Sequence, residues 1–201
     1  DKERMASSSG GVFFALAKKI IEKGGVVFGA IFDQNWEVKH TYAETIEAVR
    51  PMIGSKYLQS RIEQTYKEAE EFLKQGREVM FVGSPCQISG LKSFLGNRDY
   101  VNVLDVYFLC HGVPSPGVWR RYLHETFCLD NINNRKGSVK QFISYAHSNA
   151  KLNISNIQFR NKTENGWKKF SLVVRGRKFN NDKDSILKST THSDDSFMRG
   201  F

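Results

Sequence analysis

Apolar side chains recur at spacings of three and four residues in two stretches of the first half of the chain, the pattern of a helix with one buried face. The spacing predicts a helix over Val12–Lys23 that ends at a Gly-Gly pair, with Ser7-Ser8-Ser9 supplying its N-cap. A second helix is predicted over Gln59–Gln75, where Gly76 ends the pattern.

Runs of apolar residues bounded by turn-forming residues predict several strands. Val26–Phe32 is almost entirely apolar and predicts a buried strand, and Glu37–Tyr42 predicts a second strand after a polar turn. Two strand-loop-helix units follow. In one, Val79–Val82 leads through a Gly-Ser-Pro-Cys-Gln loop into a helix over Ile88–Leu95. In the other, Val101–Leu109 leads through a Cys-His-Gly-Val-Pro link into a helix opened by a Ser-Pro pair.

The last third of the chain has a β-rich pattern. Gln141–Ala146, Leu152–Phe159 and Trp167–Val174 predict an antiparallel meander, and the polar tail Asn180–Ser196 predicts a loop. We therefore expect an α/β fold with a parallel or mixed sheet core and flanking helices, plus an appended antiparallel β-rich segment. The expected domains are residues 1–130 and 131–201, with the pattern changing near residues 128–137.

Composition narrows the class of protein. The chain has 201 residues, of which 40% are hydrophobic and 25% charged, so it can bury a sizeable core. No apolar run approaches the roughly 18 residues of a membrane-spanning helix, and no secretory signal is recognisable. We therefore expect a cytoplasmic protein without a membrane partner.

The positive charge is concentrated in the second half. Residues 1–100 carry 14 Lys and Arg against 13 Asp and Glu, a net of +1, whereas residues 101–201 carry 16 against 8, a net of +8. Between Arg135 and Lys188 the basic residues are interleaved with aromatic ones, a pattern that single-strand nucleic-acid surfaces share. A basic nucleic-acid-binding module without redox activity is therefore an alternative, although no recognised nucleic-acid motif accompanies the charge.

Two glycine-containing motifs are candidate phosphate or cofactor sites. The first, Ser7-Ser8-Ser9-Gly10-Gly11, precedes the first predicted helix, whose free amides and positive end can hold an anion. An ordinary helix cap is the alternative. The second, Gly54-Ser55-Lys56-Tyr57, combines a hydroxyl, a cation and a stacking ring, which are suited to a phosphate and an aromatic cofactor ring. Its alternative is a surface turn.

The three cysteines are too few for a disulfide framework. Cys86 and Cys110 each follow a predicted strand, so in a parallel sheet both would emerge at the same carboxyl edge, and we expect the two thiols to converge there. Either thiol could be a nucleophile, as in a thiol-dependent hydrolase or transferase, or a metal ligand. Cys128 is expected to be a core residue. His111 could donate a proton to a reduced cofactor or simply cap its loop.

Taken together, these motifs resemble the coenzyme F-420 hydrogenase/dehydrogenase beta-subunit family. The matching stretches are Ser7–Phe13, Gly54–Tyr57 with Gln59-Ser60, Val82–Ile88 with Gly90-Leu91, Cys110–Ser115, and Phe159-Arg160 with Gly166-Trp167. The resemblance runs from about residue 4 to the end of the sequence, and the motifs around the cysteines are the specific ones.

The resemblance implies an iron-sulfur flavoprotein oxidoreductase in which FAD passes electrons between a 4Fe-4S cluster and a hydride carrier of the coenzyme F-420 type or another substrate. It implies three groups of FAD-binding residues: Ser8, Ser9, Gly10 and Gly11 for the pyrophosphate; Gly54, Ser55, Lys56 and Tyr57 for the flavin or ribityl region; and Gly83, Ser84, Pro85 and Gln87 between flavin and cluster. Cys86 and Cys110 would be cluster ligands, and His111 is the candidate catalytic residue.

The chain departs from the family pattern in one important respect. Family members usually have a Cys-x-x-Cys motif further downstream, and we expect it, with the remaining cluster ligands, beyond residue 201. On this interpretation the sequence is a fragment. The expected partners are ferredoxin or a hydrogenase- or dehydrogenase-type electron-transfer protein, together with the small-molecule hydride carrier.

Overall fold

Four strands form the first sheet of the structure, a computed structural model that describes residues 2–98, 100–127, 154–166, 171–177, 184–191, 194–195 and 197–198. The strand order is β2-β1-β3-β4. β1 (Val26–Phe32) pairs antiparallel with β2 (Val38–Ala43) and parallel with β3 (Val79–Gly83). β3 in turn pairs parallel with β4 (Val103–Tyr107). The carboxyl ends of β1, β3 and β4 therefore lie along one edge of this sheet.

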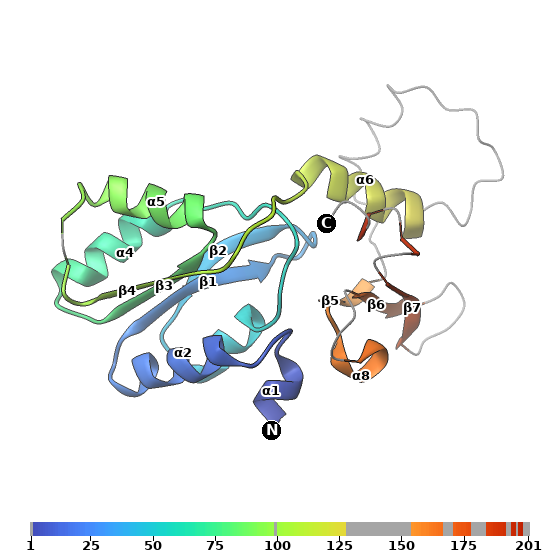
Figure 1. Cartoon of the computed structure of the whole chain (residues 1–201), viewed down its shortest axis with the longest axis horizontal. Helices are drawn as coiled ribbons and strands as arrows, with labels where there is room; N and C mark the ends of the chain where they lie inside the picture. The colour runs from blue at the N-terminus through green and yellow to red at the C-terminus, as the bar shows by residue number, and fades with distance from the viewer. Residues whose placement is uncertain are drawn as a thin grey trace.

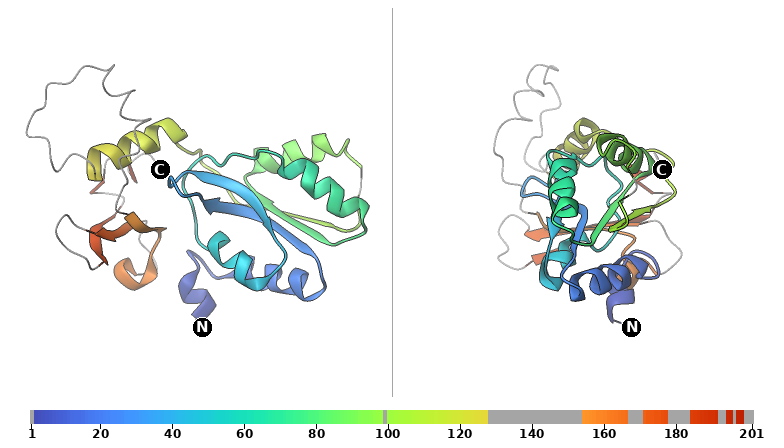
Figure 2. Two further views of the ribbon diagram at one scale, coloured as in Figure 1. Left: turned by 180° about the vertical axis from the view of Figure 1, so that it is seen from behind. Right: turned by 90° about the vertical axis from the view of Figure 1, so that its left-hand side faces the viewer.

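Helices cover both faces of the first sheet, whose central strands β1 and β3 are apolar on both sides (Figures 1 and 2). α4 (Thr65–Lys74) and α5 (Pro85–Phe94) pack on one face, against Phe28 and Phe81 among others. α2 (Val12–Glu22), α3 (Ile46–Val49) and the 3-10 helix η1 (Arg50–Met52) pack on the other, against Val27 and Met80. Successive strand residues point to opposite faces, so these adjacent residues belong to different core clusters.

A second sheet is antiparallel and lies beyond the carboxyl edge of the first (Figure 1). Its strand order is β5-β6-β7, from β5 (Ile154–Phe159), β6 (Ser171–Arg177) and β7 (Asp184–Thr191). The short helices α1 (Lys2–Ala6) and α8 (Lys162–Asn165) lie beside each other below the two sheets in this view. The longer α6 (Pro116–Phe127) packs its buried Trp119, Tyr122 and Leu123 against the second sheet.

This architecture confirms the expected fold class: a mixed sheet with flanking helices and a separate antiparallel sheet. The predicted strand Val26–Phe32 matches β1 in both bounds. Ser115 opens α6 as expected, since its Oγ accepts a hydrogen bond from the amide of Val118 at 3.3 Å. The predicted strand at 141–146, Cys128 and the 128–137 boundary lie outside the described residues, so the division into two domains stays a prediction. No helix in the described part of the chain is long and apolar enough to cross a membrane.

The predicted helix over Gln59–Gln75 is wrong in its first turn and a half, because α4 begins only at Thr65. Arg61 instead pairs with β2: its amide donates to the carbonyl of Val38, and its carbonyl accepts from the amide of His40. Glu63 then has a positive φ of 49°, which a helix does not accommodate. Tertiary pairing thus overrides the helical periodicity in this segment.

Three smaller expectations also need correction. The serines do not cap α2, because its N-cap is Gly11, at φ 86° and without a side-chain hydrogen bond. Pro85, Cys86 and Gln87 belong to the first turn of α5 and not to a loop before it. The tail predicted as a loop contains β7, an edge strand whose residues are mostly polar and which hence carries little apolar signal.

Candidate functional site

The segment Gly54–Arg61, called here the linking segment, connects the motifs that the sequence singles out. The amide of Ser55 donates to Ser8 Oγ at 2.7 Å, which joins the second glycine motif to the first. The amide of Gln59 donates to the carbonyl of Pro114 at 3.3 Å, in the Cys110 loop. Gln87 Nε2 donates to the carbonyl of Ser60 at 3.4 Å. The linking segment therefore contacts the serine motif, the Cys110 loop and the start of α5.

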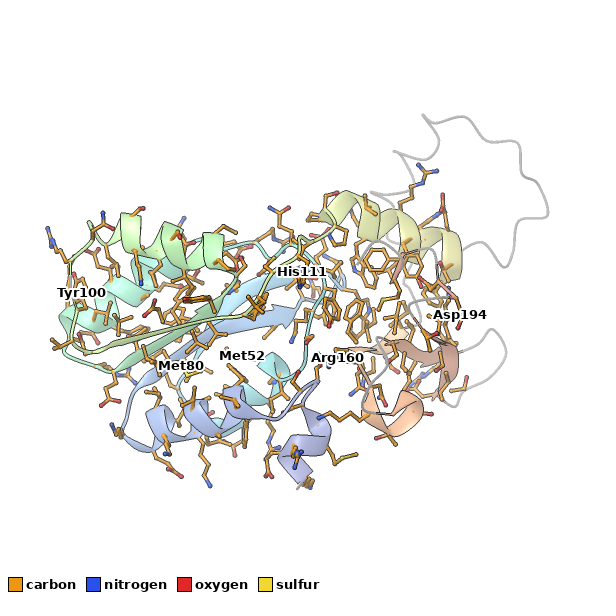
Figure 3. All side chains as sticks on the ribbon, in the orientation of Figure 1. Met52, Met80, Tyr100, His111, Arg160 and Asp194 are labelled. Atoms are coloured by element: carbon orange, nitrogen blue, oxygen red, sulfur yellow. The ribbon has the colours of Figure 1, made fainter. Side chains whose placement is uncertain are left out.

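Ser8 also ties the first sheet to the second. Its buried Oγ donates to the carbonyl of Phe159 at the end of β5, at 3.2 Å, while accepting from Ser55. The next side chain, Ser9, accepts a hydrogen bond from Arg160 Nη1 at 3.2 Å. Figure 3 shows Arg160 in the region between the two sheets. The serine motif thus works as a junction between the two sheets and not as a helix cap.

A cavity of about 590 Å³ lies at this junction. It is lined from one side by residues of α1, η1 and the linking segment, and from the other by the end of β5, α8 and β6. Phe32, Trp36 and Phe159 supply aromatic walls. The described lining contains no Asp or Glu but five cationic residues: Arg50, Lys56, Arg160, Lys162 and Arg175. An anion that enters this cavity therefore meets only cationic charged side chains in the described lining.

Two of the five cations are lysines whose charge is destabilised by their surroundings. Burial lowers the pKa of Lys56 to about 8. Lys162 is 6% exposed, and its pKa is lowered by desolvation first and by the positive charges of Arg4 and Arg160 second. Its Nζ donates to the carbonyls of Arg4 and Ser9, which fastens α8 to the N-terminal segment. The fold thus places these cations close together, although desolvation and mutual repulsion both disfavour their charged forms.

Cys86 lies exposed in the first turn of α5, after the N-cap Ser84. Its Sγ is 3.1 Å from Ser84 Oγ, and Gln87 Oε1 accepts a hydrogen bond from the amide of Ser84 at 2.9 Å. A Cβ at Gly83 would come within 3.1 Å of the Gln87 side chain, so glycine keeps that capping side chain in place.

Cys110 lies exposed three residues beyond the end of β4. The register pairs Gly83, the last residue of β3, with Tyr107, the last residue of β4, so the two cysteines follow neighbouring strand ends at equal chain distance. His111, also exposed, is next in this loop. Within the described residues no group of three or more His, Cys, Asp or Glu side chains could hold a metal ion. The two described thiols supply only half of the four ligands that a 4Fe-4S cluster needs.

His40 is a buried residue at this edge that belongs to none of the sequence motifs. Its Nε2 is 2.9 Å from the carbonyl of Val82, and its Nδ1 is 2.6 Å from Ser60 Oγ. Its ring stacks on Phe81, with centroids 5.6 Å apart. Desolvation lowers the pKa of His40, with a smaller contribution from the charge of Lys56. The neutral ring donates to the carbonyl and accepts from Ser60, which fixes the linking segment to β3.

The predicted cofactor residues differ in their position relative to the cavity. Ser8, Gly54, Ser55 and Lys56 line the cavity. Ser9 and Tyr57 adjoin it, because Ser9 accepts from Arg160 and the Tyr57 ring packs edge-on against Phe159, with centroids 5.3 Å apart. The others are not among its lining residues: Gly10, Gly11, Gly83, Ser84, Pro85 and Gln87. The structure thus brings together the serine motif and the linking segment, whereas the cysteine motifs lie along the sheet edge.

Sequence reasoning missed most of the cavity's cations. Arg160 was part of a matching stretch but was not selected as a site residue, and Arg50, Lys162 and Arg175 belonged to no motif. The basic second half of the chain was the one available signal for the last two. Whether a cationic residue lines the cavity depends on how the two sheets pack, and the spacing of apolar residues along the chain does not reveal this.

Comparison with known proteins identifies a similar chain among solved structures. No protein-family model and no curated protein matches the chain. Among solved structures, it is similar to a chain from the xenon-derivatized F420-reducing NiFe hydrogenase complex of Methanosarcina barkeri, with a TM-score of 0.55 and 17% sequence identity. The alignment covers 96% of this chain and 58% of that one. At this identity the similarity establishes a shared fold, that of a chain found in a hydrogenase complex.

Proposed function

We propose that this protein is a flavin-dependent oxidoreductase that holds FAD in the cavity between its two sheets. The observation that carries the proposal is the cavity itself, where two candidate cofactor motifs meet within hydrogen-bonding distance among cations and aromatic rings. Its volume falls in the range of about 300–1,000 Å³ that is common for ligand sites.

The chemistry of the lining suits FAD. The pyrophosphate needs cationic and N–H donors, which Lys56, Arg160 and Arg175 offer. The flavin and adenine rings need flat apolar contacts, which Trp36 and Phe159 offer. When bound, FAD would supply two-electron acceptance as hydride and release of single electrons. The chain's own part would be to hold the anionic portion and to keep the rings against the aromatic walls.

The cysteines enter the proposal as half of a cluster site. Cys86 and Cys110 are proposed as two ligands of a 4Fe-4S cluster, and His111 as the group that exchanges a proton with the reduced cofactor or its substrate. The described donor set does not complete a cluster, so we derive no electron-transfer step through one. The shared fold with a chain of an F420-reducing hydrogenase complex supports a hydride carrier of that class and a hydrogenase- or ferredoxin-type partner.

Flavin binding is the direct test of this proposal. We expect saturable one-to-one binding of FAD to the purified chain, measured by flavin fluorescence and by quenching of the tryptophan emission, to which Trp36 in the cavity lining contributes. Arg160→Ala should weaken binding by about 10- to 100-fold, since a hydrogen bond to a charged group contributes about 1.5–3 kcal/mol.

The control for this titration is Lys67→Ala, which removes an exposed cation on α4, away from the cavity. It should bind FAD like the wild type. Absence of saturable FAD binding would overturn the proposal, and salt-sensitive binding of single-stranded oligonucleotides in its place would favour the nucleic-acid alternative.

The pairing of the cysteines can be tested separately with a short thiol-specific bifunctional reagent. We expect one intramolecular link between Cys86 and Cys110, identified by peptide mass spectrometry, because both thiols are exposed beyond neighbouring strand ends. Cys86→Ser and Cys110→Ser should each abolish this link and leave only single modification at Cys110 or at Cys86, respectively. A wild type that shows only independent single modifications would exclude a shared cluster site.

A further inference from the structure

Lys56 is a half-buried lysine with an unusual set of partners. Its Nζ donates to the carbonyl of Met52 at 3.3 Å and to the carbonyl of Gly54 at 3.1 Å. It also lies 6.0 Å from the centroid of the Phe32 ring. An ammonium has three N–H donors, so these carbonyls take two of them. No carboxylate in the described structure forms an ion pair with Lys56.

The charged groups around Lys56 are almost all positive. The other four cations that line the cavity come from η1, from the chain after β5 and from β6. His40, from β2, senses the charge of Lys56 and is itself held neutral by burial. The neighbouring acids are engaged elsewhere: Asp33 and Glu37 pair with Arg61, and Glu164 pairs with Arg175. Figure 3 shows Met52 on the side of the first sheet and Arg160 toward the second.

This arrangement is costly unless an anion enters the cavity. Desolvation of an ammonium is repaid only by a counter-charge or by loss of the proton. Without a ligand, loss of the proton becomes easy, and the pKa of Lys56 is accordingly about 8. A phosphate within reach of Nζ would supply the missing negative charge and would restore the protonated form.

We propose that Lys56 is the anion-selecting residue of the cavity, and that it couples the binding of a phosphate group to the uptake of a proton. The inference rests on the proposed function, which makes the cavity a ligand site. It adds that the group recognised is a phosphate and that Lys56 must be protonated for it to bind. Below pH 8 both free and bound forms carry the proton, so affinity is independent of this group. Above pH 8 the free form loses its proton first, so affinity falls by up to tenfold per pH unit.

The test uses ADP as the probe, because the last proton of its terminal phosphate dissociates with a pKa of about 6, below the range of interest. Isothermal titration calorimetry with the full chain, between pH 7 and pH 9.5, measures affinity and, in buffers of different ionisation enthalpy, the protons taken up. We expect wild-type affinity to drop about fivefold from pH 8 to pH 9, with proton uptake in the same range. Adenosine, which has no phosphate, should show no such pH dependence.

Two substitutions at the same position separate charge from structure. Lys56→Arg keeps a permanent cation, so it should bind ADP with little change between pH 7 and pH 9. Lys56→Met removes the cation, so it should bind at least about tenfold more weakly at pH 7, and its weaker binding should not change with pH. Lys67→Met, on the exposed face of α4, should follow the wild type throughout. Thermal unfolding of each variant verifies that it is folded.

The outcomes distinguish this inference from the proposed function. If ADP binding shows the Lys56-dependent pH profile but FAD does not bind, the flavin function fails and the anion subsite stands. If FAD binds but Lys56→Arg and Lys56→Met both keep the wild-type pH profile, the flavin function stands and the inference about Lys56 is wrong.

Discussion

Replacing Trp119 with alanine is expected to lower the free energy of unfolding by about 3–5 kcal/mol, the range for removing a large buried aromatic side chain. Trp119 is 1% exposed, and its ring contacts those of Tyr122, Phe159 and Phe197, with centroids 5.0–5.9 Å apart. Its Nε1 donates to the carbonyl of Trp36 at 2.6 Å, across the two sheets. Urea denaturation of wild type and variant measures the loss.

Two further variants show where the Trp119 effect comes from. Trp119→Phe keeps most ring contacts but removes the hydrogen bond, so it should lose less stability than the alanine variant. Val118→Ala alters a neighbouring side chain of α6 that is 54% exposed, and should change stability by no more than about 0.5 kcal/mol. Equal unfolding midpoints for Trp119→Ala and Val118→Ala would show that α6 does not hold the second sheet in place.

Replacing Asp195 with alanine should cost about 3–5 kcal/mol, because breaking a buried ion pair leaves a charge without its partner. The carboxylate is 1% exposed and accepts hydrogen bonds from Tyr122 Oη and Lys188 Nζ at 2.9 and 2.5 Å. The amides of Phe197 and Met198 also donate to it. Asp195 therefore fastens the end of the described chain to β7 and α6. Asp184→Asn is the control, since Asp184 pairs with Arg177 only at 3.6 Å and in solvent.

The same carboxylate gives stability a defined pH dependence. Desolvation alone would raise the pKa of Asp195, but the hydrogen bonds from Lys188, Met198 and Tyr122 outweigh it, and the net pKa is lowered. A lowered folded-state pKa contributes stability that is present above the unfolded value of about 4 and is lost as the pH falls through the folded value. Melting temperatures between pH 6 and pH 3 should therefore fall more for the wild type than for Asp195→Asn. Parallel curves for the two proteins would contradict this role.

Much of the first sheet was predictable because its central strands, β1 and β3, are mostly buried. A strand covered by helices on both sides must be apolar at successive positions, so β1 was recognisable in both bounds. The capping of α6 by Ser115 was also local chemistry. The helix predicted to begin at Gln59 was wrong in its first turn because non-local partners hold this segment. Arg61 pairs with the backbone of β2 and with the carboxylates of Asp33 and Glu37.

The candidate site was predictable only in part. The serine motif and Gly54–Tyr57 were selected from their residue types, and the backbone amide of Ser55 does donate to the side chain of Ser8. Arg160 after β5, Lys162 on α8 and Arg175 on β6 were not selected, because the basic character of this half of the chain does not show which cations line a cavity. β7 was missed as well, since an exposed edge strand carries little hydrophobic alternation.

Local sequence patterns alone determined the order of most elements, the burial of the first sheet and the two glycine motifs, since each depends on residues near one another in the chain. The tertiary structure decided that Lys56 and Arg160 line one cavity and that Ser8 joins the two sheets. The physical reason is that a cavity forms between separately folded elements, and its charge is a sum over residues that only packing brings together.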